Sequence, residues 1–295
     1  MHVGGRHLGY CTNVHPGETL ADLNLVVEEH IPRIAQLLGH PGEFGAGLRI
    51  GHGLTRRLVE SPSALERLLD LCQARNVYVF TVNGFPYGDF QASSVKASVY
   101  QPDWRSRARL NYTVELAELL ARLPGPKVRT ISTVAGGYKP DTSSDDVKIL
   151  MAAHLREAAT QLARVADGTG VHIRLCLEPE PWTTLETTQE AIDFFVNYLG
   201  IDHPAVREHL GLCYDCCHQA VLFEDASDSI RALDLAGIVI GKVQLSSALH
   251  LDAPLAEGGR AQQIVETAAG GADRAVRGER RAGEEVEADG VGPLD

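Results

Sequence analysis

Residues 174–181, RLCLEPEP, are the stretch from which both the fold and the chemistry can be worked out. An apolar run typical of a buried strand ends there in Glu178, and Pro179 stops the strand because proline cannot donate to a sheet ladder. Residues 210–215, LGLCYD, repeat the pattern: a second apolar strand runs into Asp215, and His218 follows three residues later. Two strands that each end in a carboxylate predict a functional site at the carboxyl ends of a sheet.

Outward from this stretch, short apolar runs alternate with segments of helical period, which predicts seven strand-then-helix units. Parallel neighbours need a crossover connection, so this alternation favours a parallel α/β sheet. The expected strands are Leu8–Val14, Gly45–Ile50, Val77–Val82, Val128–Thr133, Val171–Leu177, Leu210–Tyr214 and Ile238–Leu245. The expected helices are Leu23–Leu38, Ala64–Ala74, Leu110–Leu123, Val147–Val165, Thr187–Leu199 and Asp225–Ala236.

An open doubly wound sheet and a closed (β/α)8 TIM barrel both fit this order of elements. No Gly-x-Gly-x-x-Gly follows any expected strand, which weakens a dinucleotide-binding fold. Polar residues collect just after the strand ends, where barrel active sites are built, and 295 residues suit one barrel of roughly 250 residues. The barrel is therefore the favoured fold.

Composition and charge exclude several classes of protein. The net charge of −12 argues against a nucleic-acid partner, because such proteins need clustered Lys and Arg. No run of about 18 apolar residues predicts a membrane span. The first residues lack the apolar core of a signal peptide, and the six cysteines are not spaced as a disulfide framework, so we expect a cytoplasmic protein with free thiols.

The composition changes after residue 252. Residues 253–295 are rich in Ala, Gly, Arg and Glu and hold no aromatic residue, so we expect a tail that is partly helical or disordered. The barrel domain would then occupy residues 1–252 with about seven units, its eighth unit missing or altered. One hypothesis is a frame shift or truncation in the coding sequence of this region. Translating the other frames of the gene would test it.

Glu178 and Asp215 are the strongest candidates for a metal site, with Gln244 as a weaker third ligand, and Glu178 and His218 are the candidate catalytic residues. A buried carboxylate is costly unless it is paired, and a cation is a natural partner. Carboxylate and imidazole ligands suit Mg²⁺, Mn²⁺, Co²⁺ or Zn²⁺. The alternatives are surface carboxylates at strand ends, a hydrogen-bonded histidine at a helix start, and a thiolate zinc site that uses Cys213, Cys216 and Cys217 with His218.

Four further polar residues at strand ends are candidate substrate ligands. Gln244 alternates with apolar neighbours, so its side chain shares one strand face with Ser246; its carbonyl oxygen suits a hard metal or a substrate hydroxyl. His15 follows the first strand, and Asn83 lies in a Gly/Pro/aromatic loop after the third. Lys139 follows the fourth strand, where it suits an anion such as phosphate. Each of these residues also has a purely structural interpretation.

The sequence resembles the xylose isomerase-like barrel superfamily of sugar (phosphate) isomerases and epimerases, on Leu-Glu-Pro at 177–179 and Leu-x-x-Asp-x-x-His at 212–218. More narrowly, residues 10–18 (YCTNVHPGE), 79–88 (VFTVNGFPYG) and 242–247 (KVQLSS) resemble the EboE-type metabolite-traffic family. The resemblance implies metal ligands at Glu178 and Asp215 and a substrate-binding His218. The superfamily's next metal ligand, a histidine, is replaced by Gln244, and its last glutamate has no match after Leu251.

Three functions follow from this resemblance. In the first, a metal polarises a carbonyl of a small sugar-like or phosphorylated metabolite and Glu178 removes a proton from the adjacent carbon. Glu180 is a poor second acid/base here, since a residue two positions along tends to lie on the same side. The second is a non-catalytic metabolite-binding module, and the third a phosphodiesterase acting on abasic DNA, which the charge of −12 disfavours. The sequence leaves a homo-oligomer open.

Overall fold

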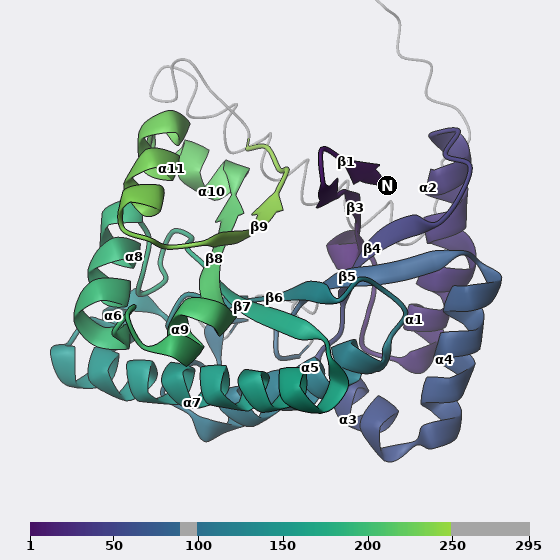
Figure 1. Cartoon of the computed structure of the whole chain (residues 1–295), viewed down its shortest axis with the longest axis horizontal. Helices are drawn as coiled ribbons and strands as arrows, with labels where there is room; N and C mark the ends of the chain where they lie inside the picture. The colour runs from purple at the N-terminus through teal and green to yellow at the C-terminus, as the bar shows by residue number, and fades with distance from the viewer. Residues whose placement is uncertain (89–98, 249–295) are drawn as a thin grey trace, which may run out of the picture. The chain divides into compact units, whose positions relative to one another are not determined.

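The computed structural model describes residues 1–88 and 99–248, and the described residues lie in one compact unit, Met1–Ala248. Seven parallel strands form one sheet in the order in which they occur in the sequence (Figure 1). They are β3 (Gly9–Cys11), β4 (Phe44–Arg49), β5 (Val77–Asn83), β6 (Val128–Val134), β7 (His172–Glu178), β8 (Leu210–Asp215) and β9 (Ile240–Gln244). Each overlaps one predicted strand, so the sequence-based strand assignment is confirmed. The predicted tail and eighth unit lie outside the described residues.

The sheet curls until distant strands face each other across an interior. The Nζ atom of Lys242 on β9 donates to the Oγ atom of Ser132 on β6 at 3.0 Å, although β6 and β9 are three positions apart in the strand order. Among the described residues, β3 and β9 form no ladder with each other. Within the described residues, the architecture is therefore a curled, seven-stranded sheet of the TIM-barrel type whose first and last strands are not paired, which is consistent with the predicted missing or altered eighth unit.

Helices connect the strands and cover the outer face of the sheet. The long helix α7 packs beside α5 and α9 along this face (Figure 1). The helices are α1 (Leu20–Leu25), α2 (Ile31–Leu37), α3 (His52–Glu60), α4 (Pro62–Ala74), α5 (Arg107–Arg122), α6 (Lys139–Thr142), α7 (Asp145–Thr169), α8 (Thr188–Phe194), α9 (Pro204–His209), α10 (Cys216–Val221) and α11 (Ala226–Leu235). A β-hairpin of β1 (His2–Val3) and β2 (Arg6–His7) precedes the sheet.

Local capping sets where several helices begin. Capping boxes at Thr19 and Thr187 start α1 and α8, and π-helical segments, Val26–His30 and Phe195–Leu199, continue each beyond its first turns. All six predicted helices are present. The prediction omitted the short helices α3, α6, α9 and α10.

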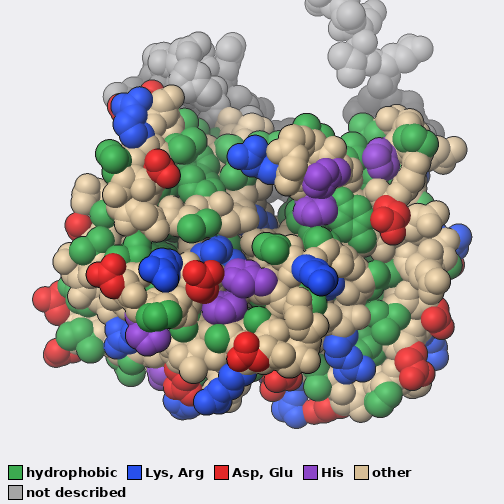
Figure 2. Space-filling model, in the orientation of Figure 1, with side chains coloured by type: hydrophobic (Ala, Val, Ile, Leu, Met, Phe, Trp, Pro, Cys, Tyr) green, Lys and Arg blue, Asp and Glu red, His purple; other side chains and the backbone are tan. Residues whose placement is uncertain are grey.

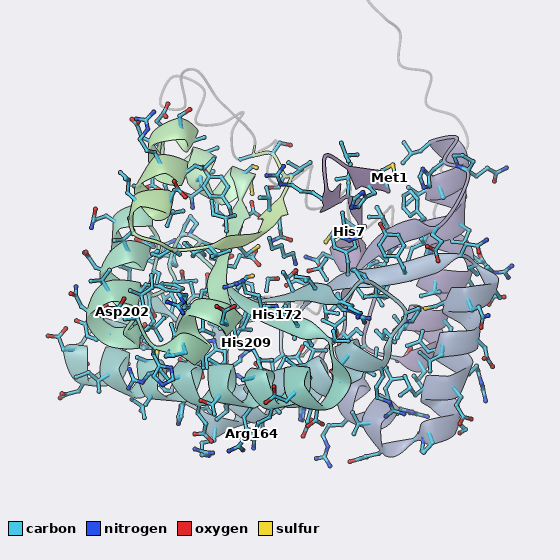
Figure 3. The ribbon with its side chains drawn as sticks, in the orientation of Figure 1. Met1, His7, Arg164, His172, Asp202 and His209 are labelled. Carbon is cyan, nitrogen blue, oxygen red and sulfur yellow. The ribbon has the colours of Figure 1, made fainter. Side chains whose placement is uncertain are left out.

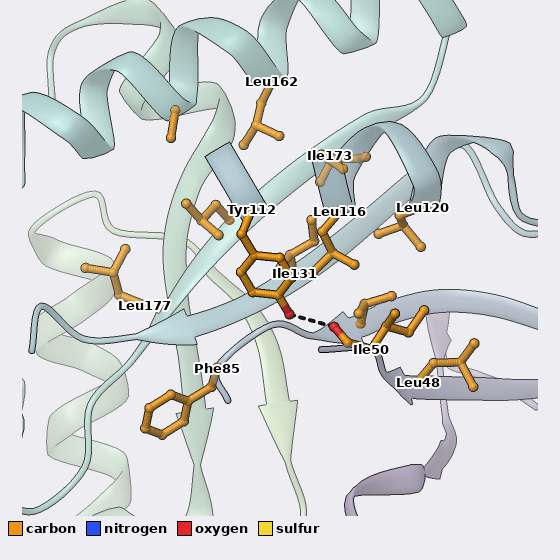
Figure 4. Close-up of a cluster of buried hydrophobic side chains, with 14 of the residues drawn as sticks. Leu48, Ile50, Phe85, Tyr112, Leu116, Leu120, Ile131, Leu162, Ile173 and Leu177 are labelled. Atoms are coloured by element: carbon orange, nitrogen blue, oxygen red, sulfur yellow. Dashed lines mark hydrogen bonds between the residues drawn. The ribbon is translucent and has the colours of Figure 1, made fainter. Parts of the chain in front are cut away.

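Strand alternation separates the core from the barrel interior. On β7, Ile173, Leu175 and Leu177 are fully buried apolar residues, and Arg174, Cys176 and Glu178 alternate with them. The apolar set belongs to the core between sheet and helices (Figure 4). In that core, the Tyr112 hydroxyl donates to the carbonyl oxygen of Ile50 at 2.6 Å.

The amino end of the barrel is occupied by structural contacts. His172 and His209 stack with their ring centroids 4.7 Å apart (Figure 3), and His209 Nδ1 lies 2.8 Å from the carbonyl oxygen of Ile173. The Arg174 guanidinium donates to the Leu210 carbonyl oxygen at 2.6 Å. The polar groups at the amino end are engaged in these stacking contacts and hydrogen bonds, so we look for a functional site at the carboxyl ends of the strands.

Candidate functional site at the carboxyl ends of the strands

Glu178, Asp215 and Gln244 are the last residues of three neighbouring strands, β7, β8 and β9. The side-chain amide of Gln244 donates to Glu178 Oε1 at 2.6 Å. Register places these residues side by side, because Asp215 pairs with Gln244 in the parallel ladder. The structure thus brings together three residues that lie 66 positions apart at most in the sequence.

Glu178 is the most buried carboxylate of this cluster, with 3% of its surface exposed. Its second oxygen, Oε2, is buried and forms no hydrogen bond with any of the described residues. Burial raises the pKa of Glu178 because the charged form is poorly solvated, and the nearby Lys242 ammonium acts in the opposite direction. A buried carboxyl group with an unused oxygen can accept a proton or a cation.

Lys242 is a site residue that the sequence analysis missed. It sits two residues before Gln244 on β9, so its side chain shares the interior face of the strand. Its Nζ atom bonds Ser132 Oγ, and Ser132 Oγ in turn donates to Asn83 Oδ1 at 2.8 Å. The alternation that selected Gln244 was a signal that also pointed to Lys242.

Asp215 is held by its own helix and by the loop after β9. Its Oδ1 atom accepts from the backbone amides of Cys217 at 3.0 Å and His218 at 3.3 Å, which makes Asp215 the N-cap of α10. The Ser246 hydroxyl donates to the same oxygen. Among the described residues, Asp215, Cys217 and His218 form the one group whose possible metal-ligand atoms lie within 4.8 Å of one another.

The ligand group of Asp215, Cys217 and His218 can be compared with the thiolate zinc site that the sequence left open. Cys213 is fully buried inside β8, where burial raises its thiol pKa well above the usual value. Neither Cys213 nor Cys216 belongs to the ligand group within the described part of the protein. The geometry offers one thiol with a carboxylate and an imidazole instead of a set of four sulfur and nitrogen ligands.

Glu180 and His218 form a second polar pair at the same end. His218 Nε2 lies 3.6 Å from Glu180 Oε2, and His218 Nδ1 lies 3.2 Å from the carbonyl oxygen of Pro179. Burial, followed by repulsion from Glu178, raises the pKa of Glu180 to about 8. The sequence analysis set Glu180 aside, but the chain turns at Pro179 and gives Glu180 a buried position of its own.

The other predicted substrate ligands divide into two groups. Asn83 ends β5 and is buried in the network with Ser132, so it joins the cluster. His15 follows β3, where its ring stacks on His30 at 4.3 Å and its Nε2 lies 2.9 Å from the Tyr10 hydroxyl.

Lys139 is engaged by carboxylates of the loop after β7 and of α8. Its Nζ atom bonds Glu186 at 2.7 Å and Glu190 at 2.6 Å. An anion at Lys139 would have to compete with both carboxylates.

Charged side chains of both signs are interspersed on the face shown in Figure 2. Within the residues that the structure describes, no helix combines the length and apolar character needed to cross a membrane.

Comparison with known families identifies the class of protein that this fold and site define. A family model described as xylose isomerase-like TIM barrel matches residues 45–267. The chain belongs to this family, which confirms the predicted fold and superfamily. No curated protein matches the chain.

Several solved structures are similar to this chain at low sequence identity. An AP endonuclease, family 2, from Brucella melitensis has a TM-score of 0.50 and 15% identity, covering 88% of this chain and 86% of that one. The probable 3-DHS dehydratase AsbF from Bacillus anthracis has a TM-score of 0.49 and 17% identity, covering 78% and 70%. The 3-keto-D-glucoside 4-epimerase YcjR from E. coli has a TM-score of 0.46 and 15% identity, covering 88% and 98%.

Proposed function

We propose that this chain binds a small sugar-like metabolite at the carboxyl ends of the strands and moves a proton on it, as an isomerase or epimerase. Glu178 is the base that would remove a proton from the carbon next to a carbonyl group. The observation that carries this proposal is the buried Glu178 Oε2, which no described residue hydrogen-bonds, on a carboxyl group whose burial raises its pKa. A general base needs this combination of an available oxygen and an upward-shifted pKa.

A divalent metal ion is part of the proposal. Asp215, Cys217 and His218 fit one because their ligand atoms lie within 4.8 Å of one another, and the carbonyl oxygen of Gln244 would be an additional ligand. Among Mg²⁺, Mn²⁺, Co²⁺ and Zn²⁺, the thiol favours Zn²⁺ or Co²⁺ since sulfur is a soft ligand. The bound ion would supply Lewis acidity at a substrate carbonyl.

Proton return needs a second group, for which Glu180 is available. The carboxyl group of Glu180 has a pKa raised to about 8, so at neutral pH it is largely a proton donor. His218 lies 3.6 Å from it and hydrogen-bonds the backbone of Pro179. We assign Glu178 and Glu180 to opposite steps of the transfer.

A role in metabolite traffic, as an EboE-type protein, is supported by where the motif residues lie. The motif at 242–247 contains Lys242, Gln244 and Ser246, which contact Ser132, Glu178 and Asp215 respectively. The motif at 79–88 supplies Asn83 to the same network. Long motifs whose residues converge on one site favour a shared ligand within that narrower family.

A non-catalytic binding module is the second candidate, and the contact between Gln244 and Glu178 favours it. The Gln244 amide occupies one oxygen of Glu178, and Lys242 supplies a positive charge nearby. Both interactions stabilise the ionised carboxylate without a metal ion. In such a module, the site would hold a metabolite and hand it on unchanged.

Hydrogen exchange at carbon distinguishes the two functions. The protein is loaded with Mn²⁺, Co²⁺ or Zn²⁺ in D₂O with a panel of aldoses, ketoses and their phosphates, and NMR follows loss of the proton next to the carbonyl. Wild-type protein should exchange it; Glu178→Gln should be slower by about 10²-fold or more. The exposed Glu118→Gln is the matched control. A sugar that binds but never exchanges would establish the binding module instead.

Metal binding is tested separately by titration of the metal-free protein with Zn²⁺ and Co²⁺. Asp215→Asn should lose affinity while keeping the helix cap, because asparagine caps helices about as well as aspartate. The exposed Asp167→Asn should bind like wild type. Unchanged metal affinity in Asp215→Asn would refute the assigned ligand set.

A further inference from the structure

Four aromatic side chains form a row along the carboxyl ends of β5, β6 and β7. Ring centroids of Phe85 and Tyr100 lie 6.0 Å apart, those of Tyr100 and Tyr138 5.7 Å, and those of Tyr138 and Trp182 6.4 Å. The interplanar angles are 26°, 15° and 31°, so successive rings are close to parallel. The row begins at the buried Phe85 and ends at Trp182, 62% of which is exposed.

Trp182 is kept exposed at a conformational cost. Its φ angle is 72°, in the left-handed region that a bulky residue rarely adopts. Its backbone amide donates to Glu186 Oε1 at 2.6 Å, and its carbonyl oxygen accepts from the amide of Lys139 at 2.8 Å. Strained residues that the surroundings hold in place are concentrated at ligand-binding sites. The backbone of Trp182 is therefore held by hydrogen bonds to two loops, and the indole that it carries is exposed.

The row leads to the carboxylate cluster. The Tyr100 hydroxyl lies 3.5 Å from the carbonyl oxygen of Pro181, between Glu180 and Trp182 in the sequence. Burial and then the neighbouring Glu180 raise the pKa of Tyr100. Trp182 is four residues beyond Glu178 in the sequence, and the Tyr100 end of the row lies next to Glu180.

We propose that Trp182, backed by Tyr138 and Tyr100, is a stacking surface for an uncharged sugar ring. The face of an aromatic ring is electron-rich and attracts the weakly positive C–H groups on the apolar face of a pyranose. This inference rests on the proposed function, because it names the ligand class that the same site would receive.

Charge near the row decides against a phosphorylated ligand. The Glu186 carboxylate accepts a hydrogen bond from the backbone amide of Trp182. Lys139, whose backbone amide donates to the Trp182 carbonyl, already bonds two carboxylates, Glu186 and Glu190. A phosphate group here would meet net negative charge, whereas a neutral ring would meet hydroxyl-binding carboxylates beside an apolar face.

Saturation-transfer NMR and tryptophan fluorescence on the chain of residues 1–295 test the proposal. The probes are methyl β-D-glucopyranoside, the acyclic alditol glucitol, and glucose 6-phosphate. The protein has two tryptophans, and Trp104 is fully buried with its Nε1 bonded to Thr133, so a change on ligand addition reports on Trp182. The glucopyranoside should shift the emission and receive saturation on its axial C–H face, and glucitol should do neither.

Substitutions then assign the binding to the indole. Trp182→Ala should weaken glucopyranoside binding about three- to tenfold, while Trp182→Phe retains most of it. Phe223→Ala is the matched control, since Phe223 is also exposed (89%) and also has a positive φ, 58°. Thermal unfolding should be alike in all three variants, because each side chain is mainly in solvent.

Several results would overturn the inference: equal binding by wild type and Trp182→Ala, no binding of the glucopyranoside, or tighter binding of glucitol or glucose 6-phosphate. None of them would decide the proposed function, which depends on Glu178 and is measured by hydrogen exchange. Conversely, loss of exchange without loss of Trp182-dependent binding would reject the isomerase and keep the stacking surface.

Discussion

Replacing Glu180 with glutamine should stabilise the protein at alkaline pH and have little effect at pH 4. Folding raises the pKa of Glu180 from 4.5 to about 8, and the side chain is only 15% exposed. Between these two values the folded state binds a proton that the unfolded state has released. Stability must therefore fall as pH rises through this window, and glutamine, which cannot ionise, removes that loss.

The size of the effect follows from the same shift. One pKa unit corresponds to about 1.4 kcal/mol, so the upper limit is roughly 5 kcal/mol. Water penetration reduces the stability gain below this limit, and so does the nearby His218, which forms an ion pair with Glu180 only when it is protonated. We expect a gain of about 2 kcal/mol at pH 9, or about 4–8 °C in melting temperature for a protein of this size.

Urea and thermal unfolding at pH 4, 6, 8 and 9, with a chelator present, measure this gain. The informative quantity is the difference between Glu180→Gln and wild type at each pH, because other groups titrate equally in both. The exposed Glu118→Gln supplies the control and should show no pH-dependent difference. Parallel stability curves for wild type and Glu180→Gln would mean that Glu180 is ordinarily solvated and that the reasoning from burial is wrong.

Three other predictions concern the framework and the metal ligands. Gly136→Ala should lower the free energy of unfolding by about 2–4 kcal/mol, because φ is 93° there and a Cβ atom would lie 2.3 Å from Thr184 Oγ1. Gly168→Ala, which has open space around it, should leave the free energy of unfolding in urea unchanged or raise it. Equal losses in the two variants would refute this reasoning. Asp215→Ala should lose about 1 kcal/mol in chelator through the lost helix cap, whereas asparagine should not. Cys217→Ser should weaken Zn²⁺ binding more than Mn²⁺ binding in metal titrations; equal weakening would exclude the thiol as a ligand.

Much of the site could be predicted from strand ends alone. Glu178 and Asp215 each end an apolar strand, and parallel strands place their carboxyl ends at one edge, so their proximity followed from pattern. Lys242 could have been found by extending the alternation from Gln244. The position of Glu180 could not, because it depends on how the backbone turns at Pro179 and on the packing of His218 against that turn.

The aromatic row likewise could not be predicted from the sequence. Phe85, Tyr138 and Trp182 follow three different strands and lie far apart in the sequence, so no local pattern links them. Their alignment depends on the strand register and on hydrogen bonds between the loops after β6 and β7. The ion pairs of Lys139 could not be predicted either, because Glu186 and Glu190 lie next to it only where the loops after β6 and β7 pack together.

By itself, the sequence of this protein determined the strands, the helices and the parallel barrel, because hydrophobic period and capping residues are local properties of a polypeptide. It also determined which carboxylates end the strands. Only the tertiary structure decided which groups share a site: that Gln244 binds Glu178, that Asp215 sits with Cys217 and His218, and that Trp182 is held exposed. The physical reason is that burial and through-space contact set pKa values and ligand geometry, and both arise from the curl of the sheet.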